Sequence, residues 1–157
     1  RARSARDKQE RRAAILAAAE ELFEARGLAF TMADAAEGAG LAKGTLYLYF
    51  TTKEAMLLAL LEEKLFAWFD AMDARLDAAA ARRGAPALAA LLSSSVAEEP
   101  TLVRLLAVLQ TVLEHNIAPE EVLPFKTELA RRTAATGARL EIRGLPKGEG
   151  ERLLLRF

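Results

Sequence analysis

The stretch from Lys43 to Tyr47 has the chemistry of a surface that reads nucleic acid. Lys43 carries an ammonium, Thr45 a short hydroxyl and Tyr47 a phenol, while Gly44 has no side chain at all. Ammonium and hydroxyl groups bind phosphate oxygens and base edges, and a glycine lets another molecule approach the backbone closely. If these residues lie on one exposed helical turn, we expect them to contact DNA.

Short helices must position that stretch. The sequence predicts helices at about Lys8–Arg26, Met32–Glu37 and Ala42–Tyr49, with apolar side chains on one face of the first. Thr31 is an expected N-cap, since its hydroxyl oxygen can accept from an amide two or three residues later. Residues 38–40 form a glycine-bearing turn. Two short helices joined in this way make a helix-turn-helix, whose second helix lies in the DNA major groove.

A purely structural interpretation of the same residues stays open. The glycines can serve only to make a tight corner, and aromatic residues can serve only as core. We favour the core for Leu46, Tyr49 and Phe50, because apolar side chains are needed there to fix the third helix on the first. We favour exposure for Tyr47, which is out of phase with Tyr49.

Longer helices are predicted for the rest of the chain, and Thr51 and Glu54 fit a capping box at the start of the first of them. Their expected ranges are Lys53–Arg82, Pro86–Ala97, Thr101–His115, Pro119–Arg143 and a last helix from about Glu149. The sequence therefore predicts an all-α fold. A helix-turn-helix domain is expected over residues 1–53 and a helical bundle over residues 54–157. Because the chain stops inside an apolar run, we expect further helices of the bundle to lie beyond it.

Residues 12–61 resemble the DNA-binding domain of TetR-family transcriptional regulators. The matching pieces are "ILAAA" and "LFEARG" in the first helix, a threonine before the second, "AGLAKGTLYLYF" across the turn and third helix, and "TKE" at the start of the fourth. This match covers about a third of the chain. It implies a DNA-binding regulator that recognises a double-stranded, palindromic operator as a homodimer, most simply as a repressor.

The resemblance also implies site residues. Those with DNA-facing roles are Thr31, Lys43, Gly44, Thr45, Tyr47, Tyr49 and Lys53. Members of the family carry a variable helical domain after the fourth helix, which usually binds a small molecule and dimerises through its last two helices. Here that domain is rich in apolar side chains, as ligand pockets are, so a small, largely apolar effector is expected.

Candidate pocket residues combine aromatic, methionine and polar side chains. They are Phe66, Phe69, Met72, Arg104, Leu109, Gln110, Leu113, His115 and Phe125. The structural alternative is that the aromatic and methionine stripe is ordinary core, and that His115 and Asn116 only end a helix.

Composition limits the other function classes. The chain of 157 residues has no cysteine and one histidine, which excludes disulfides and cysteine nucleophiles and argues against a metal centre or a cofactor. No paired carboxylates or phosphate-binding loop suggest an enzyme. No apolar run approaches the roughly 20 residues that cross a membrane, and no signal-like start is present, so the cytoplasm is the expected location.

Charge is unevenly placed along the chain. Its formal net charge is zero, yet residues 1–12 hold six basic and two acidic side chains. Such a segment can bind a polyanion locally, or it can be an ordinary solvated tail.

Two rival functions stay open beside the repressor. One is a TetR-like DNA-binding protein without a small-molecule effector, controlled by a protein partner. The other is a helical interaction module whose front part no longer binds DNA. Salt-dependent DNA affinity separates the second rival from the regulator, because phosphate contacts release counterions.

Overall fold

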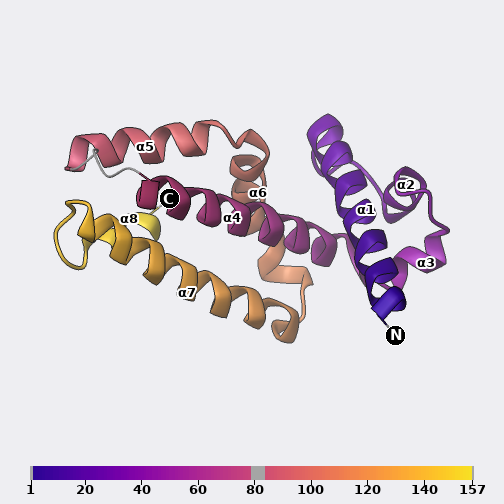
Figure 1. The fold of residues 1–157 in the computed structure, drawn as a ribbon. Coiled ribbons are helices and arrows are strands. Elements are labelled where there is room, and N and C mark those ends of the chain that lie inside the picture. The colour runs from indigo at the N-terminus through magenta and orange to yellow at the C-terminus, as the bar shows by residue number, and fades with distance from the viewer. Residues whose placement is uncertain (1, 79–83, 157) are drawn as a thin grey trace. The chain divides into compact units, whose positions relative to one another are not determined.

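Helices form the framework of the chain in the computed structural model (Figure 1), which describes residues 2–78 and 84–156. The side chains of residues 2–4 and 109–116 lie outside that description. The helices are α1 (Ala2–Arg26), α2 (Met32–Gly38), α3 (Lys43–Tyr47), α4 (Lys53–Ala78), α5 (Ala85–Ala97), α6 (Pro100–Asn116), α7 (Pro119–Ile142) and α8 (Glu149–Leu154). The described residues contain no strand, and the predicted all-α class is confirmed.

Helix α1 begins at Ala2, six residues before the predicted start at Lys8. The prediction relied on the apolar face, and the first buried side chain of α1 is that of Ile15. The preceding residues are alanine, arginine, lysine, glutamine and glutamate for the most part, which favour helix without packing. An ion pair between Arg6 and Glu10, one turn apart at 2.8 Å, adds to this preference.

Helix α3 is shorter than predicted, ending at Tyr47 instead of Tyr49. Directly after the helix two amides bond to carbonyls three residues back: the Leu48 amide donates to Thr45 and the Tyr49 amide to Leu46. This tighter winding is common where an α-helix ends.

The N-cap of α4 differs from the predicted one. The expected box between Thr51 and Glu54 is wrong, because α4 begins at Lys53 and places Thr52 at the N-cap. Its hydroxyl oxygen accepts from the Ala55 amide at 3.0 Å. Alanine at that position has no carboxylate to complete a reciprocal box. The predicted end of this helix at Arg82 falls outside the described residues.

Two compact units divide the described chain. The first holds the residues up to Leu61 together with Arg104–Ile117, and the second holds Glu62–Val103 and the residues from Ala118 onward. Helices α4 and α6 each contribute to both units. No described helix is long and apolar enough to cross a membrane.

The core of the first unit joins α1, α2 and α3. Ile15 and Phe23 of α1, Ala35 of α2 and Leu46 of α3 are fully or almost fully buried. A Cβ on Gly38 would lie 3.1 Å from the Cβ of Ala18, so the end of α2 lies close against α1.

The core of the second unit is lined by α4, α5, α7 and the first residues of α6. Its large buried side chains are Leu65, Trp68, Phe69, Met72, Leu76, Leu88, Leu92, Leu102, Phe125 and Leu140. The Trp68 indole N–H donates to the Ser95 hydroxyl at 3.1 Å, which satisfies a polar group inside this core.

Helices α7 and α8 touch through their backbones. A Cβ on Gly137 would lie 2.6 Å from the Glu151 nitrogen, and one on Gly150 would overlap the Gly137 carbonyl. Both residues are buried. Any larger side chain at either position must push the two helices apart.

Candidate nucleic-acid interface

The turn before α3 is fixed by backbone bonds and by one buried side chain. Gly40 has a φ of +66°, which only glycine adopts without strain. The Leu41 amide then donates to the Ala36 carbonyl at 2.8 Å and closes the turn. Leu46 is 0% exposed and holds the inner side of α3, as predicted. The opposite side of the helix is therefore directed to solvent.

That outer side carries most of the residues with predicted base or phosphate contacts. Lys43 and Gly44 are exposed, Thr45 is half-buried, and 43% of Tyr47 is exposed. The exposure of Tyr47 confirms its predicted place outside the core. A side chain of this kind presents a hydroxyl and a ring edge to a partner.

Leu48 is a further candidate for a base contact, although it is not among the predicted DNA-facing residues. It directly follows α3 and is 81% exposed. An apolar side chain there can contact a thymine methyl group in the major groove. The available signal was its position two residues from buried Leu46, beside exposed Tyr47 and at the end of a helix.

Gly44 has no structural reason to be glycine. Its φ is not positive, and a Cβ placed on it would find no atom within 4 Å. Glycine inside a helix costs about 1 kcal/mol relative to alanine. The missing side chain therefore leaves space that no described residue fills, as close approach of a partner requires.

Thr31 acts as the predicted N-cap. Its hydroxyl oxygen accepts from the Asp34 amide at 3.2 Å, and the Asp34 carboxylate accepts from the Thr31 amide at 2.7 Å. The same carboxylate also accepts from the Thr31 hydroxyl at 3.0 Å, and the bond from the Thr31 backbone amide, followed by this one, lowers the pKa of Asp34. The carboxylate occupies the positive end of α2, so the structure supplies Thr31 with a capping role, and its phosphate contact stays a prediction.

Lys53 fastens the start of α4 to the loop that leads into α2. Its ammonium donates to the carbonyls of Leu28 and Phe30 at 2.8 and 3.1 Å, and it lies 5.3 Å from the centre of the Phe30 ring. These bonds use two of the three donors of the ammonium, and a phosphate contact of Lys53 stays a prediction.

Arg104 of α6 contacts the end of α1 as Lys53 contacts the loop, through main-chain carbonyls and an aromatic ring. Its guanidinium donates to the carbonyls of Phe23 and Glu24 at 3.1 and 3.2 Å and lies 5.0 Å from the centre of the Phe23 ring. These are carbonyls of the last helical turns, where cations are stabilising. The structure thus gives Arg104 a contact with α1, while its pocket role stays a prediction.

Tyr49 and Phe50 follow α3 into the interior. Phe50 is 7% exposed, in agreement with its predicted place in the core, and Tyr49 is half-buried. The guanidinium of Arg12 lies 5.6 Å from the centre of the Phe50 ring, which links the N-terminal part of α1 to the end of α3.

Part of the predicted effector site lies together in the second unit. The rings of Phe66 and Phe125 stack with centroids 6.0 Å apart, and Phe69 and Met72 are 3% and 1% exposed. Their burial fits both a pocket wall and ordinary core. The side chains of Leu109, Gln110, Leu113 and His115 lie outside the described part of the structure.

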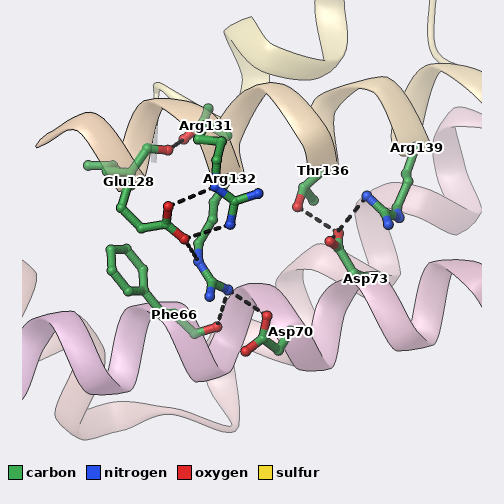
Figure 2. A network of polar contacts seen from close by, with 10 residues as sticks. Phe66, Asp70, Asp73, Glu128, Arg131, Arg132, Thr136 and Arg139 are labelled. Atoms are coloured by element: carbon green, nitrogen blue, oxygen red, sulfur yellow. Dashed lines mark hydrogen bonds and ion pairs between the residues drawn. The ribbon is translucent and has the colours of Figure 1, made fainter. Parts of the chain in front are cut away.

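A network of charged residues borders these aromatic rings (Figure 2). Arg132 of α7 donates to the Phe66 carbonyl at 3.0 Å and to Asp70 of α4, and it lies 4.7 Å from the centre of the Phe66 ring. Glu128 accepts from Arg131 and Arg132, and these bonds lower its pKa to about 2.

The network continues along both helices in parallel register. Thr136 donates to Asp73 at 2.6 Å, and Arg139 pairs with Asp73 at 3.2 Å and with Asp77 at 3.5 Å. Polar groups thus fix the register of α7 on α4 over several turns.

Two protein-family models match the chain. The model described as "Bacterial regulatory proteins, tetR family" matches residues 15–60, and "Tetracyclin repressor-like, C-terminal domain" matches residues 62–157. The second match alone covers more than half of the chain.

Curated relatives match over about a third of the chain. The chain is 52% identical over 54 residues to the "HTH-type transcriptional regulator EthR" of Mycobacterium tuberculosis, which is 34% of this chain and 25% of that protein. It is 47% identical over 62 residues to EthR of Mycolicibacterium smegmatis, which is 38% of this chain and 29% of that protein. The matched stretches thus span between a quarter and a third of these relatives.

One solved structure shares the fold over a longer range. The fatty acid degradation regulator FadR of Bacillus halodurans superposes with a TM-score of 0.55 and 24% sequence identity, over 82% of this chain and 68% of that one. At this identity the likeness shows the fold alone.

Proposed function

Because the chain belongs to the TetR family of DNA-binding transcriptional regulators, a non-enzymatic family, we propose that it is a repressor. As a homodimer it occupies a palindromic operator and leaves it when a small, largely apolar ligand binds. Residues 1–53 bind the DNA, and residues 54–157 belong to the part that senses the ligand and dimerises.

The outer side of α3 is the observation that carries this proposal. Lys43, Gly44 and Tyr47 lie on solvent-directed positions of a helix that Leu46 anchors from within. The glycine leaves open space beside the ammonium and the phenol. This combination suits close approach to the floor of a major groove, where hydrogen bonds and methyl contacts identify bases.

Two-fold symmetry sets the length of the operator. Dimeric helix-turn-helix proteins place their recognition helices about one DNA turn apart, roughly 34–36 Å. A ligand that prefers a dimer with another spacing releases the operator. It does so only to the extent that its affinity differs between the two states.

An apolar effector is supported by the side chains in the second unit. Phe66, Phe69, Met72 and Phe125 gather there with one guanidinium, that of Arg132, at the edge. Ligand pockets have this make-up, mostly apolar with few polar groups. The alternative is a regulator without an effector, released by a protein partner, in which these side chains are core only.

Fluorescence anisotropy tests the DNA-binding proposal. The protein is titrated into labelled duplexes from its own promoter region and into scrambled duplexes, each at two salt concentrations. We expect selective binding to a palindromic site that weakens steeply with salt. Tight binding without selectivity contradicts operator recognition.

A substitution on α3 makes the test specific. Tyr47→Ala should weaken operator binding at least about tenfold, because a good base contact is worth about 1–3 kcal/mol. Its thermal unfolding should not change, since Tyr47 lies outside the core. Lys126→Ala, which removes an exposed side chain of α7, serves as the control.

A screen of apolar compounds for release of the wild-type complex then decides between effector and protein partner.

A further inference from the structure

The first turns of α1 contribute no buried side chain to the described core. Every side chain from Ala5 to Ala14 is exposed, and burial begins only at Ile15. The segment extends the packed part of α1, and its residues favour helix without packing. Its charged side chains are therefore not needed for the core and can contact a partner.

Charge is distributed unequally around this segment. With 3.6 residues per turn, Lys8, Arg11 and Arg12 fall on one face of α1. The other face carries Arg6 and Glu10, which neutralise each other in an ion pair at 2.8 Å.

Neither Lys8 nor Arg11 has a hydrogen bond or an ion pair with any described residue. The acid nearest to this face is Asp7, which lies between the two faces and one turn before Arg11. One side of the helix therefore presents an excess of uncompensated positive charge.

Arg12 shows where this basic face points. Its guanidinium lies 5.6 Å from the centre of the Phe50 ring, and Phe50 comes three residues after the end of α3. Figure 1 shows the N-terminal end of α1 beside α3. Lys8 lies one turn nearer the N-terminus of α1, about 6 Å from Arg12 at about 1.5 Å per residue. The basic face thus borders the C-terminal end of the recognition helix.

We propose that Lys8, Arg11 and Arg12 bind the phosphate backbone of DNA beside the groove that α3 enters. This inference rests on the proposed DNA-binding function and adds a second contact surface to it. A guanidinium over an aromatic ring keeps its N–H groups at its edge for phosphate oxygens. Because phosphates carry no sequence information, this surface strengthens binding to any duplex equally.

Salt titrations of single-charge variants test the proposal. Lys8→Gln and Arg11→Gln, alone and combined, are compared with wild type on promoter DNA and on a scrambled duplex of equal length. Arg6→Gln is the matched control, since it removes one charge from the opposite face of the same helix. Glutamine keeps helix propensity, and circular dichroism verifies the helix content.

Each lost phosphate contact should make the slope of log K against log salt less negative by about 0.9. The loss in affinity should be the same fold on both duplexes, and Arg6→Gln should leave both slopes unchanged. The proposal is overturned if the combined variant keeps the wild-type slope, or if it loses affinity only for the promoter site. If the wild-type protein binds neither duplex, both this proposal and the proposed function fail.

Discussion

The two units of this protein hold their helices together by different means. In the first, apolar side chains form the core, and the cations of Lys53 and Arg104 bind main-chain carbonyls at the end of α1 and in the loop after it. In the second, side chains pair with side chains along α4 and α7 (Figure 2), while α7 and α8 touch through Gly137 and Gly150.

This difference teaches how each unit reacts to change. Main-chain carbonyls are present at every residue, so the first unit depends mainly on its core and on two cations. The second unit depends on the identity of matched partners and on the absence of side chains at a crossing. We therefore expect single substitutions at matched positions to destabilise the second unit, while substitutions on the outer side of α3 leave stability almost intact.

The largest effect is expected at the crossing of α7 and α8. Gly150→Ala would place a methyl group onto the Gly137 carbonyl, and neither backbone can yield without separating the helices. We expect the free energy of unfolding to fall by about 3 kcal/mol, the upper part of the range for overpacking. Urea unfolding at fixed protein concentration measures it. An unchanged midpoint would show that the two helices are not in contact.

The second effect concerns the polar network of α7. Arg132→Met removes the bonds to Asp70, Glu128 and the Phe66 carbonyl but keeps a side chain over the ring. We expect a loss of about 2 kcal/mol, because several charge-assisted bonds disappear together. Arg131→Met is the control: its side chain is 64% exposed, and exposed pairs contribute about 0–1 kcal/mol. An equal loss of unfolding free energy in both variants would contradict the larger contribution expected from Arg132.

A smaller effect should appear in acid. The pKa of Glu128 is lowered from 4.5 to about 2 in the folded protein. Its contribution to stability is therefore fully present above pH 4.5 and is lost as the pH falls from 4.5 to about 2. Glu128→Gln should flatten the dependence of unfolding free energy on pH in this window. Glu63→Gln, at an exposed position of α4, should keep the wild-type profile.

The smallest effect on stability should have the opposite sign. Gly44→Ala adds a methyl group into open space inside α3. We expect an increase in stability of about 0.5–1 kcal/mol, from the lower backbone entropy of alanine in the unfolded chain. Operator affinity should fall in the same variant, because the methyl group would occupy the space through which DNA approaches in the proposed complex. A variant that gains stability and keeps its affinity would contradict the role proposed for Gly44.

The front of the chain could be predicted well from sequence because its signals are local. Gly40 and Thr31 set turn and cap within a few residues, and the spacing from Leu46 to Tyr47 separates core from surface. The prediction of helix ends was limited for the same reason. The apolar face of α1 says nothing about residues before Ile15, so the helix start at Ala2 was missed.

The helices of the second unit could be predicted from sequence, but the side-chain pairs between those helices could not. Nothing in the spacing of Asp73 or Arg139 indicates which helix faces it, since contacts over more than sixty residues depend on how the helices pack. The same holds for Arg104, whose partners lie some eighty residues earlier. The pocket role of the polar side chains of α6 stays a prediction, because a sequence shows polarity but not direction.

The hydrogen bonds from Lys53 and Arg104 to main-chain carbonyls affect how this protein tolerates mutation. Every amino acid carries the acceptor that these cations use, so replacements at Glu24 or Leu28 leave the bonds available. The side chains at these acceptor positions can therefore vary while the bonds from Lys53 and Arg104 are kept. The two cations and the rings of Phe23 and Phe30 must be inherited together.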